Sequence, residues 1–119
     1  MSKPRTNASY LSGIPELLVL SLLARRPMYG YELIKAIKAS TRNELEFGEG
    51  CIYPILHRLE AEGQLSSREE MARGRSRLVY SVTSSGRKQL AERVSSWERV
   101  ATAVNDSLRW GDHEQPAMA

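Results

Sequence analysis

A mainly helical fold with one small β-hairpin, of the α+β class, is predicted for this chain of 119 residues. Three observations predict it. Segments between residues 15 and 62 repeat apolar residues at helical spacing, residues 78–82 alternate, and a long helical pattern follows from residue 84 to residue 110. Hydrophobic residues make up 41% of the chain and charged residues 26%, as in an ordinary folded domain with one modest core.

The first two helices are expected at residues 15–26 and 29–40. Pro15 and Glu16 suit a first helical turn, because a missing N–H costs nothing there and a carboxylate meets the positive end of the helix dipole. The apolar run at residues 17–24 is too short to span a bilayer, so we expect a core helix and no membrane partner. A proline ends this helix, and the second follows in "YGYELIKAIKAS".

The third helix is expected over residues 51–62, where one apolar stripe faces the core and the opposite face carries tyrosine, histidine and arginine. Gly63 suits the position after its last residue. Pro54 lacks an N–H and is comfortable only within a first helical turn. Either Cys51 therefore lies near the cap, or an earlier start at Gly48 introduces a local kink, and the sequence leaves both alternatives open.

A β-hairpin is expected next, with one strand in residues 65–70 and the other in residues 78–83. In the second strand, alternation from Leu78 through Tyr80 onwards places every second residue on one face. The turn falls in "ARGRSR", where Gly74 can take a positive φ. Three arginines crowd this tip: Arg73, Arg75 and Arg77.

A long final helix is expected from a cap at residues 83–85 to about Trp110. Its apolar residues recur at alternating steps of four and three, which forms a heptad seam, and pairing with a second copy of the chain is the expected way to bury it. The alternative is packing on the first helix of the same chain, which satisfies the early positions but hardly Val104 and Leu108. The seam consists of Leu90, Val94, Trp97, Ala101, Val104 and Leu108.

Three short helices followed by a hairpin are the element order of a winged helix-turn-helix, in which the third helix enters a groove of DNA and the hairpin flanks it. We therefore expect a winged helix-turn-helix DNA-binding domain at residues 13–83 and a dimerisation helix at residues 84–110. A mobile leader at residues 1–12 and a mobile tail at residues 111–119 are expected to flank them.

DNA contact is the expected role of the hairpin tip and of the outward face of the third helix. Arginine carries a permanent charge in a planar donor fork that suits phosphates and guanine, although a solubilising turn is the plainer interpretation of the tip. Tyr53 either donates its hydroxyl to a phosphate or lies half-buried against the second helix. His57 is either a DNA contact or an ordinary surface residue, and Arg58 beside it is a candidate reader of bases.

The sequence does not predict disulfide bonds, a metal site or catalysis. The single cysteine excludes an internal disulfide framework and a cysteine-cluster zinc site, and His57, His113 and Cys51 form no spaced catalytic set. We therefore expect no enzymatic activity, no cofactor and no metal. Trp97 lies in the middle of the seam, where the two indoles of a dimer could hold a flat apolar ligand or simply pack together.

Three stretches carry a resemblance to a known family: "LARRPMYGYELIKAI" from Leu23, "GCIYPILHRLEAEG" from Gly50 and "GRSRLVYSVTSSGRKQL" from Gly74. In these motifs and their spacing the sequence resembles the PadR-type transcriptional regulators, in the shorter subgroup with a single C-terminal helix. The resemblance implies a cytoplasmic homodimeric repressor that binds an inverted-repeat operator in double-stranded DNA. Such repressors often control detoxification or efflux genes and are often released by a small aromatic effector, here near Trp97.

The resemblance also implies DNA contacts by Tyr29 and Tyr31 at the start of the second helix, by Arg75 in the wing and by four residues of the third helix. Those four are Tyr53, Pro54, His57 and Arg58. Family members usually have serine or threonine where Gly48 and Cys51 stand here, so a hydroxyl cap and a phosphate donor are lost. A dimeric winged-helix module that binds proteins without specific DNA recognition is the alternative function, suggested by the modest net charge of +3.

Overall fold

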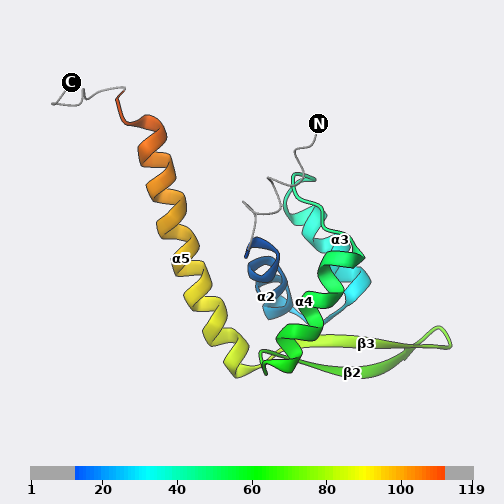
Figure 1. Ribbon diagram of the computed structural model, residues 1–119. Coiled ribbons are helices and arrows are strands. Elements are labelled where there is room, and N and C mark those ends of the chain that lie inside the picture. The colour runs from blue at the N-terminus through cyan, green and yellow to red at the C-terminus, as the bar shows by residue number, and fades with distance from the viewer. Residues whose placement is uncertain (1–12, 112–119) are drawn as a thin grey trace.

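The computed structural model describes residues 13–111, in which helices, a small sheet and one long final helix follow one another (Figure 1). The predicted mobile leader, and all of the predicted mobile tail except Gly111, lie outside the described residues. No described helix is both long and apolar enough to cross a membrane. The elements are α2 (Ile14–Arg25), β1 (Met28–Tyr29), α3 (Gly30–Ser40), α4 (Glu49–Ala61), β2 (Leu65–Ala72), β3 (Arg75–Val82) and α5 (Ser84–Arg109).

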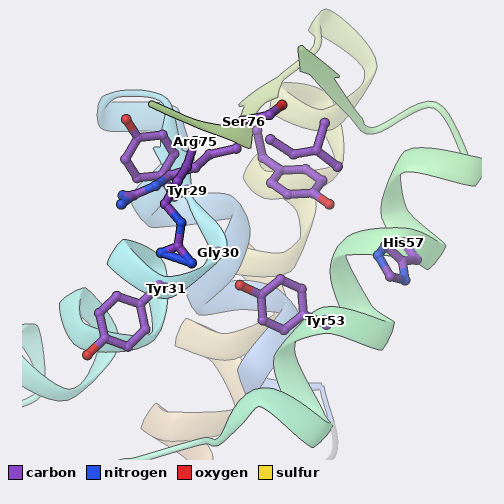
Figure 2. Close-up of a pocket in the computed structure, with 10 residues that line it drawn as sticks. Tyr29, Gly30, Tyr31, Tyr53, His57, Arg75 and Ser76 are labelled. Atoms are coloured by element: carbon purple, nitrogen blue, oxygen red, sulfur yellow. The ribbon is translucent and has the colours of Figure 1, made fainter. Parts of the chain in front are cut away.

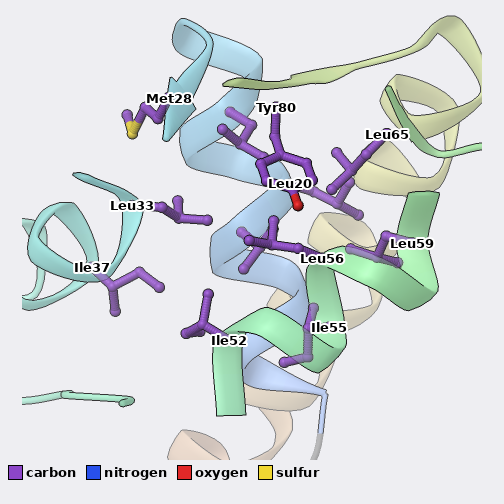
Figure 3. Packing of buried hydrophobic residues seen from close by; sticks show 12 residues of the cluster. Leu20, Met28, Leu33, Ile37, Ile52, Ile55, Leu56, Leu59, Leu65 and Tyr80 are labelled. Carbon is purple, nitrogen blue, oxygen red and sulfur yellow. The ribbon is translucent and has the colours of Figure 1, made fainter. Parts of the chain in front are cut away.

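The core lies between α2, α3, α4 and the base of the sheet (Figure 3). Each helix contributes the apolar stripe that its sequence period predicts, so the three helices share one dry interior. No polar or charged residue is buried within residues 13–111, which places the polar groups that could bind a ligand on the surface. The buried apolar residues are Val19, Leu20, Leu23, Met28, Leu33, Ile37, Ile52, Ile55, Leu56, Leu59, Leu65, Val79 and Tyr80.

The sheet has three antiparallel strands in the order β1-β3-β2, whereas the sequence predicted only the two-stranded hairpin. The additional strand is the two-residue β1, in which Met28 pairs with Tyr80 and Tyr29 pairs with Val79. The mainly helical fold with a small sheet is therefore confirmed, and the number of strands is corrected. Because β1 ends where α3 begins, this pairing fixes the start of α3 beside the base of the hairpin.

Strands β2 and β3 form the wing, and the two-residue turn between them is tight because both of its residues take positive φ. Arg73 has φ 54° and Gly74 has φ 76°, as in a type I′ turn, which confirms the prediction for Gly74. Tyr80 is buried at the base of β3, but Leu78 on the same face is 45% exposed because the wing extends beyond the helices. Val79 is buried as well, so both faces of β3 are covered at its base.

Helix α4 begins at Glu49, so Pro54 lies inside the helix and the earlier of the two predicted starts is correct. Its cap residue Gly48 makes no side-chain hydrogen bond, as expected from the missing hydroxyl. The other end closes as a Schellman motif: Gly63, with φ 80°, donates its N–H to the carbonyl of Glu60, and Gln64 donates to that of Leu59.

Helix α5 starts at a joint that links it to the end of α4. The Thr83 hydroxyl accepts the N–H of Gly86 over 3.0 Å, which caps the helix, and donates to the carbonyl of Gly63 over 2.7 Å. The N–H of Thr83 also donates to the carbonyl of Gln64 at 3.0 Å. From this joint α5 runs past α2, and its C-terminal half extends away from the rest of the described chain (Figure 1).

Candidate nucleic-acid interface

A groove of about 560 Å³ lies where the start of α3, the outward face of α4 and the strand β3 of the wing meet. Figure 2 shows its lining side chains, which come from three separate stretches of the sequence. Helices α3 and α4 form one side of the groove, and strand β3 of the wing forms the other. The groove is lined by Tyr29, Gly30, Tyr31, Tyr53, His57, Arg75, Ser76, Arg77, Leu78 and Tyr80.

Tyr53 is half-buried, and it stands against α3 at a glycine. A Cβ atom added to Gly30 would lie 2.6 Å from the Tyr53 ring and from its hydroxyl oxygen, so the ring occupies the space that any larger residue would need. Tyr53 thus packs on the second helix of the motif and also lines the groove. His57, one turn further along α4, is exposed, with its ring centroid 6.4 Å from that of Tyr53.

The wing contributes two arginines to the groove, and they are placed differently. The guanidinium of Arg77 lies 4.8 Å from the centre of the Tyr29 ring, in a cation–π contact that restrains it. Arg75 is exposed, and its side chain extends from the wing toward the start of α3 (Figure 2). Arg75 therefore remains available to an external anion.

The electrostatic character of the groove is positive, because its described lining includes two arginines and no carboxylate. The acids of the neighbouring strand are engaged within the wing: Glu70 pairs with Arg68 at 2.7 Å, and Glu69 accepts from Ser76 at 2.9 Å. The N-terminus of α3 adds the positive end of a helix dipole. A polyanion with a regular spacing of charges is the ligand that such a surface favours.

The predicted DNA-contact residues do not all meet in the groove. Tyr29, Tyr31, Tyr53, His57, Arg75 and Arg77 line it. Pro54 and Arg73 are exposed outside this lining, with Arg73 at the wing tip. Arg58 turns the other way and forms an ion pair with Glu16 of α2.

Three lining residues, Ser76, Leu78 and Tyr80, were absent from the predicted DNA contacts. Gly30 lies between the predicted contacts Tyr29 and Tyr31, at the helix start where the family resemblance implies that backbone groups lie close to phosphates. Ser76 and Leu78 carried no signal in the sequence, because their place depends on how far the wing extends past the helices. Tyr80 belongs mainly to the core, and burial, then the charge of Glu60 and then Tyr53 raise the pKa of its phenol.

A second surface of interest is the apolar stripe on the outer half of α5. Trp97 is 46% exposed, Val100 51%, Val104 47% and Leu108 75%. Leu90, by contrast, packs at the edge of the core. Leu90 at the start of the predicted seam is therefore packed within the chain, and the late part of the seam is exposed. Val100 belongs to this stripe although the strict heptad omitted it.

The architecture of three helices and a wing, with a positive groove between the third helix and the wing, defines a winged-helix DNA-binding regulator. The model of the transcriptional regulator PadR-like family matches residues 19–92. The chain belongs to this family, whose members are transcriptional regulators and not enzymes.

Individual relatives agree with this assignment. The transcriptional regulator Rv3488 of Mycobacterium tuberculosis is 41% identical over 64 residues, which cover 54% of this chain and 60% of that protein. The crystal structure of a PadR family transcriptional regulator from Eggerthella lenta superposes with a TM-score of 0.77 at 28% identity, over 91% of this chain and 93% of the other. A PadR-like transcriptional regulator from Bacillus cereus gives a TM-score of 0.73 at 31% identity, over 85% and 97%.

Proposed function

We propose that the protein is a homodimeric repressor that binds an inverted-repeat operator, with α4 as its recognition helix. The observation that carries the proposal is the groove between α4 and the wing, whose described lining is rich in tyrosine and arginine and contains no carboxylate. Tyrosine hydroxyls and arginines are common donors to DNA phosphates, and side chains on an exposed helix face reach base edges. The outward face of α4 fits the width of a major groove.

The two sides of the groove have different roles in this proposal. Tyr53 and His57 lie on the outward face of α4 and contact the operator. Pro54 lies on the exposed side of the same helix. Arg73 and Arg75 of the wing grip phosphates, because both are exposed and have no ion pair within the described residues. Tyr29 and Tyr31 border the same backbone at the start of α3.

Dimerisation through α5 would place two such domains on one operator. The exposed stripe of Trp97, Val104 and Leu108 supports this part of the proposal, because an isolated helix does not keep so many large apolar side chains in water without a partner. A two-fold axis through α5 brings two half-sites about one helical turn, or 34 Å, apart.

An effector site near Trp97 completes the proposal. The indole is partly exposed beside a groove of about 300 Å³ between α2 and α5, which also includes Leu17 and Val100. A flat aromatic compound fits between such apolar walls, and its binding would alter the spacing of the two domains. Release of a repressor by this route suits the control of detoxification or efflux genes in the cytoplasm.

Selection of operator fragments from randomised double-stranded DNA by the purified full-length protein tests the proposed function. We expect an inverted repeat to emerge, bound with a strong salt dependence, and His57→Ala to relax preference at one position of each half-site. Selection of no sequence preference at all, with weak and uniform binding, would favour the protein-interaction module instead.

A further inference from the structure

Helix α4 is held to its neighbours by two charged residues that stand on either side of the core residue Leu59. Arg58 reaches α2, where its Nη2 atom pairs with the carboxylate of Glu16. Glu60 reaches the wing, where its carboxylate accepts a hydrogen bond from the Ser67 hydroxyl at 2.7 Å. The sequence Arg-Leu-Glu thus connects α4 to α2, to the core and to the sheet within three consecutive residues.

The side of α4 that carries Arg58 differs from the side that lines the groove. Tyr53 and His57 are four residues apart and therefore share one face of the helix, and both line the groove. Arg58 is rotated by about 100° from His57, which directs it toward α2 rather than toward the wing. A second carboxylate, that of Glu62, lies 3.9 Å from Arg58 Nε.

Glu16 is well placed to keep Arg58 in an ion pair. The Glu16 side chain is only 17% exposed, compared with 46% for Arg58, so this ion pair is partly shielded from water and from salt. Glu16 also lies in the first turn of α2, where the helix dipole stabilises a carboxylate. Its charge is felt at the first turn of α4, where it adds to the effect of burial in raising the pKa of the Cys51 thiol.

We propose that Glu16 and Arg58 form a positioning pair, which fixes the angle of α4 against α2 so that His57 and Tyr53 meet the operator in register. The inference rests on the proposed DNA-binding function of the groove, and it changes the role of Arg58. Arg58 acts through the placement of α4 and does not read a base. Glu16, which had no role in DNA binding, becomes a determinant of operator specificity.

The two roles of Arg58 make opposite predictions for the isosteric variant Glu16→Gln. If Arg58 reads DNA, removal of Glu16 frees its guanidinium and removes a charge of the same sign as the phosphates, so operator binding becomes tighter. If the pair positions α4, the same substitution loosens the helix and weakens operator binding. The sign of the change therefore separates the two roles.

The experiment measures the affinity of the full-length protein for the selected operator and for an unrelated duplex of equal length. It uses the wild type, Glu16→Gln, Arg58→Gln and the double variant. We expect each single variant to lower the operator-to-unrelated ratio about fivefold, and the double variant to be no worse than either single variant. Arg58→Lys should restore part of the ratio, because it keeps a cation opposite Glu16 but lacks the fork.

A matched control corrects for the change in net charge. Glu46→Gln breaks the exposed pair between Glu46 and Lys38, whose atoms are 3.6 Å apart, and adds the same positive charge in the loop before α4, beyond the opposite end of that helix from Arg58. It should tighten binding to both duplexes slightly and leave their ratio unchanged. Thermal unfolding of every variant confirms that the folded protein is being compared.

Three results would overturn the inference. These are tighter operator binding by Glu16→Gln, a ratio in Glu16→Gln equal to that in Glu46→Gln, and losses in the two single variants that add fully in the double variant. If the second of these results comes with a lower unfolding temperature, the pair is a purely stabilising contact. If the wild type itself shows no operator preference, it is the proposed function that fails.

Discussion

Gly30 is the residue at which the packing of the groove is least tolerant of change. Replacing it with alanine places a methyl group 2.6 Å from the Tyr53 ring. We expect Gly30→Ala to lower the free energy of unfolding by about 1–3 kcal/mol, as overpacking does, and to weaken operator binding because Tyr53 and α4 must shift. Chemical denaturation and operator titration measure the two effects.

A second glycine provides a control of opposite sign. Gly50 lies in α4, and apart from its chain neighbours and the backbone of its own helix no atom lies within 4 Å of the position of its missing Cβ. Gly50→Ala should therefore raise the free energy of unfolding by about 0.5–1 kcal/mol, since alanine is the better helix former. A loss of stability in Gly50→Ala similar to that in Gly30→Ala would show that the contact with Tyr53 is not the cause.

We expect the Cys51 thiol to have low reactivity. Burial, and then the charge of Glu16, raise the pKa of its thiol above the ordinary value, so less of the reactive thiolate is present at neutral pH. Alkylation by iodoacetamide should be slower than for a cysteine in an unstructured peptide and should accelerate in Glu16→Gln. Stability contributed by the neutral thiol should be lost as the pH rises above the ordinary thiol pKa. A rate equal to that of the peptide would contradict this interpretation of Cys51.

At the scale of elements, the wing should supply electrostatic affinity through its free arginines. Arg75→Ala and Arg73→Ala should each reduce the slope of log K against log salt by about one unit or less. The reason is that each phosphate contact that is lost lowers the number of counterions released when the protein binds DNA. Arg77→Ala should change the slope less, and it should cost about 0.5–1 kcal/mol of stability through the lost contact with Tyr29.

Arg68→Ala is the matched control for the wing, because Arg68 lies on β2 and is already paired with Glu70. It removes the same charge without removing a free donor, so the salt dependence should stay as in the wild type. A triple alanine variant of Arg73, Arg75 and Arg77 with an unchanged slope would remove the wing from the DNA contact.

The helices and the hairpin could be predicted from the sequence because each carries its own period and its own end signals. The end of α4 at Gly63 follows from local chemistry, and so does the turn at Gly74, whereas the sequence leaves the start of α4 open between two alternatives. Strand β1 could not be predicted in this way. Two residues, Met28 and Tyr29, are too few to show alternation, and they are extended only because β3 pairs with them across about fifty positions of the chain.

The groove was predictable in part, for a similar reason. Residues such as Tyr53 and Arg75 were found because exposed aromatic and basic side chains at the expected helix and wing already suggest contact with DNA. The pairing of Arg58 with Glu16 joins residues 42 positions apart and depends on the angle between two helices. No local pattern contains that angle, so the sequence indicated that Arg58 is exposed but not that it pairs with Glu16.

At the scale of the whole molecule, the proposed dimer is tested by charging the stripe on α5. Val104→Glu with Leu108→Glu introduces carboxylates into an apolar interface, where burial without a partner costs several kcal/mol. We expect the double variant to become monomeric and its operator affinity to fall toward the level for unrelated DNA. Sedimentation and operator titration measure the two effects.

The control for this experiment puts the same charge on the opposite face of α5. Ser95→Glu with Thr102→Glu alters two exposed positions outside the stripe and should leave both the sedimentation and the operator affinity close to those of the wild type. A charged stripe variant that remains a dimer of unchanged stability would show that the chains associate through another surface.

The joint at Thr83 has a consequence for limited proteolysis. The wing leaves the body at Gln64 and returns at Thr83, whose N–H donates to the Gln64 carbonyl at 3.0 Å, so the two ends of the hairpin are tied together at its base. Trypsin cleaves after arginine, and Arg73 and Arg75 are exposed at the other end. A cut there should leave two fragments that stay associated through the paired strands and the joint, and operator DNA should protect the tip from the protease. Cleavage after Arg73 or Arg75 should therefore report whether operator DNA is bound to the wing.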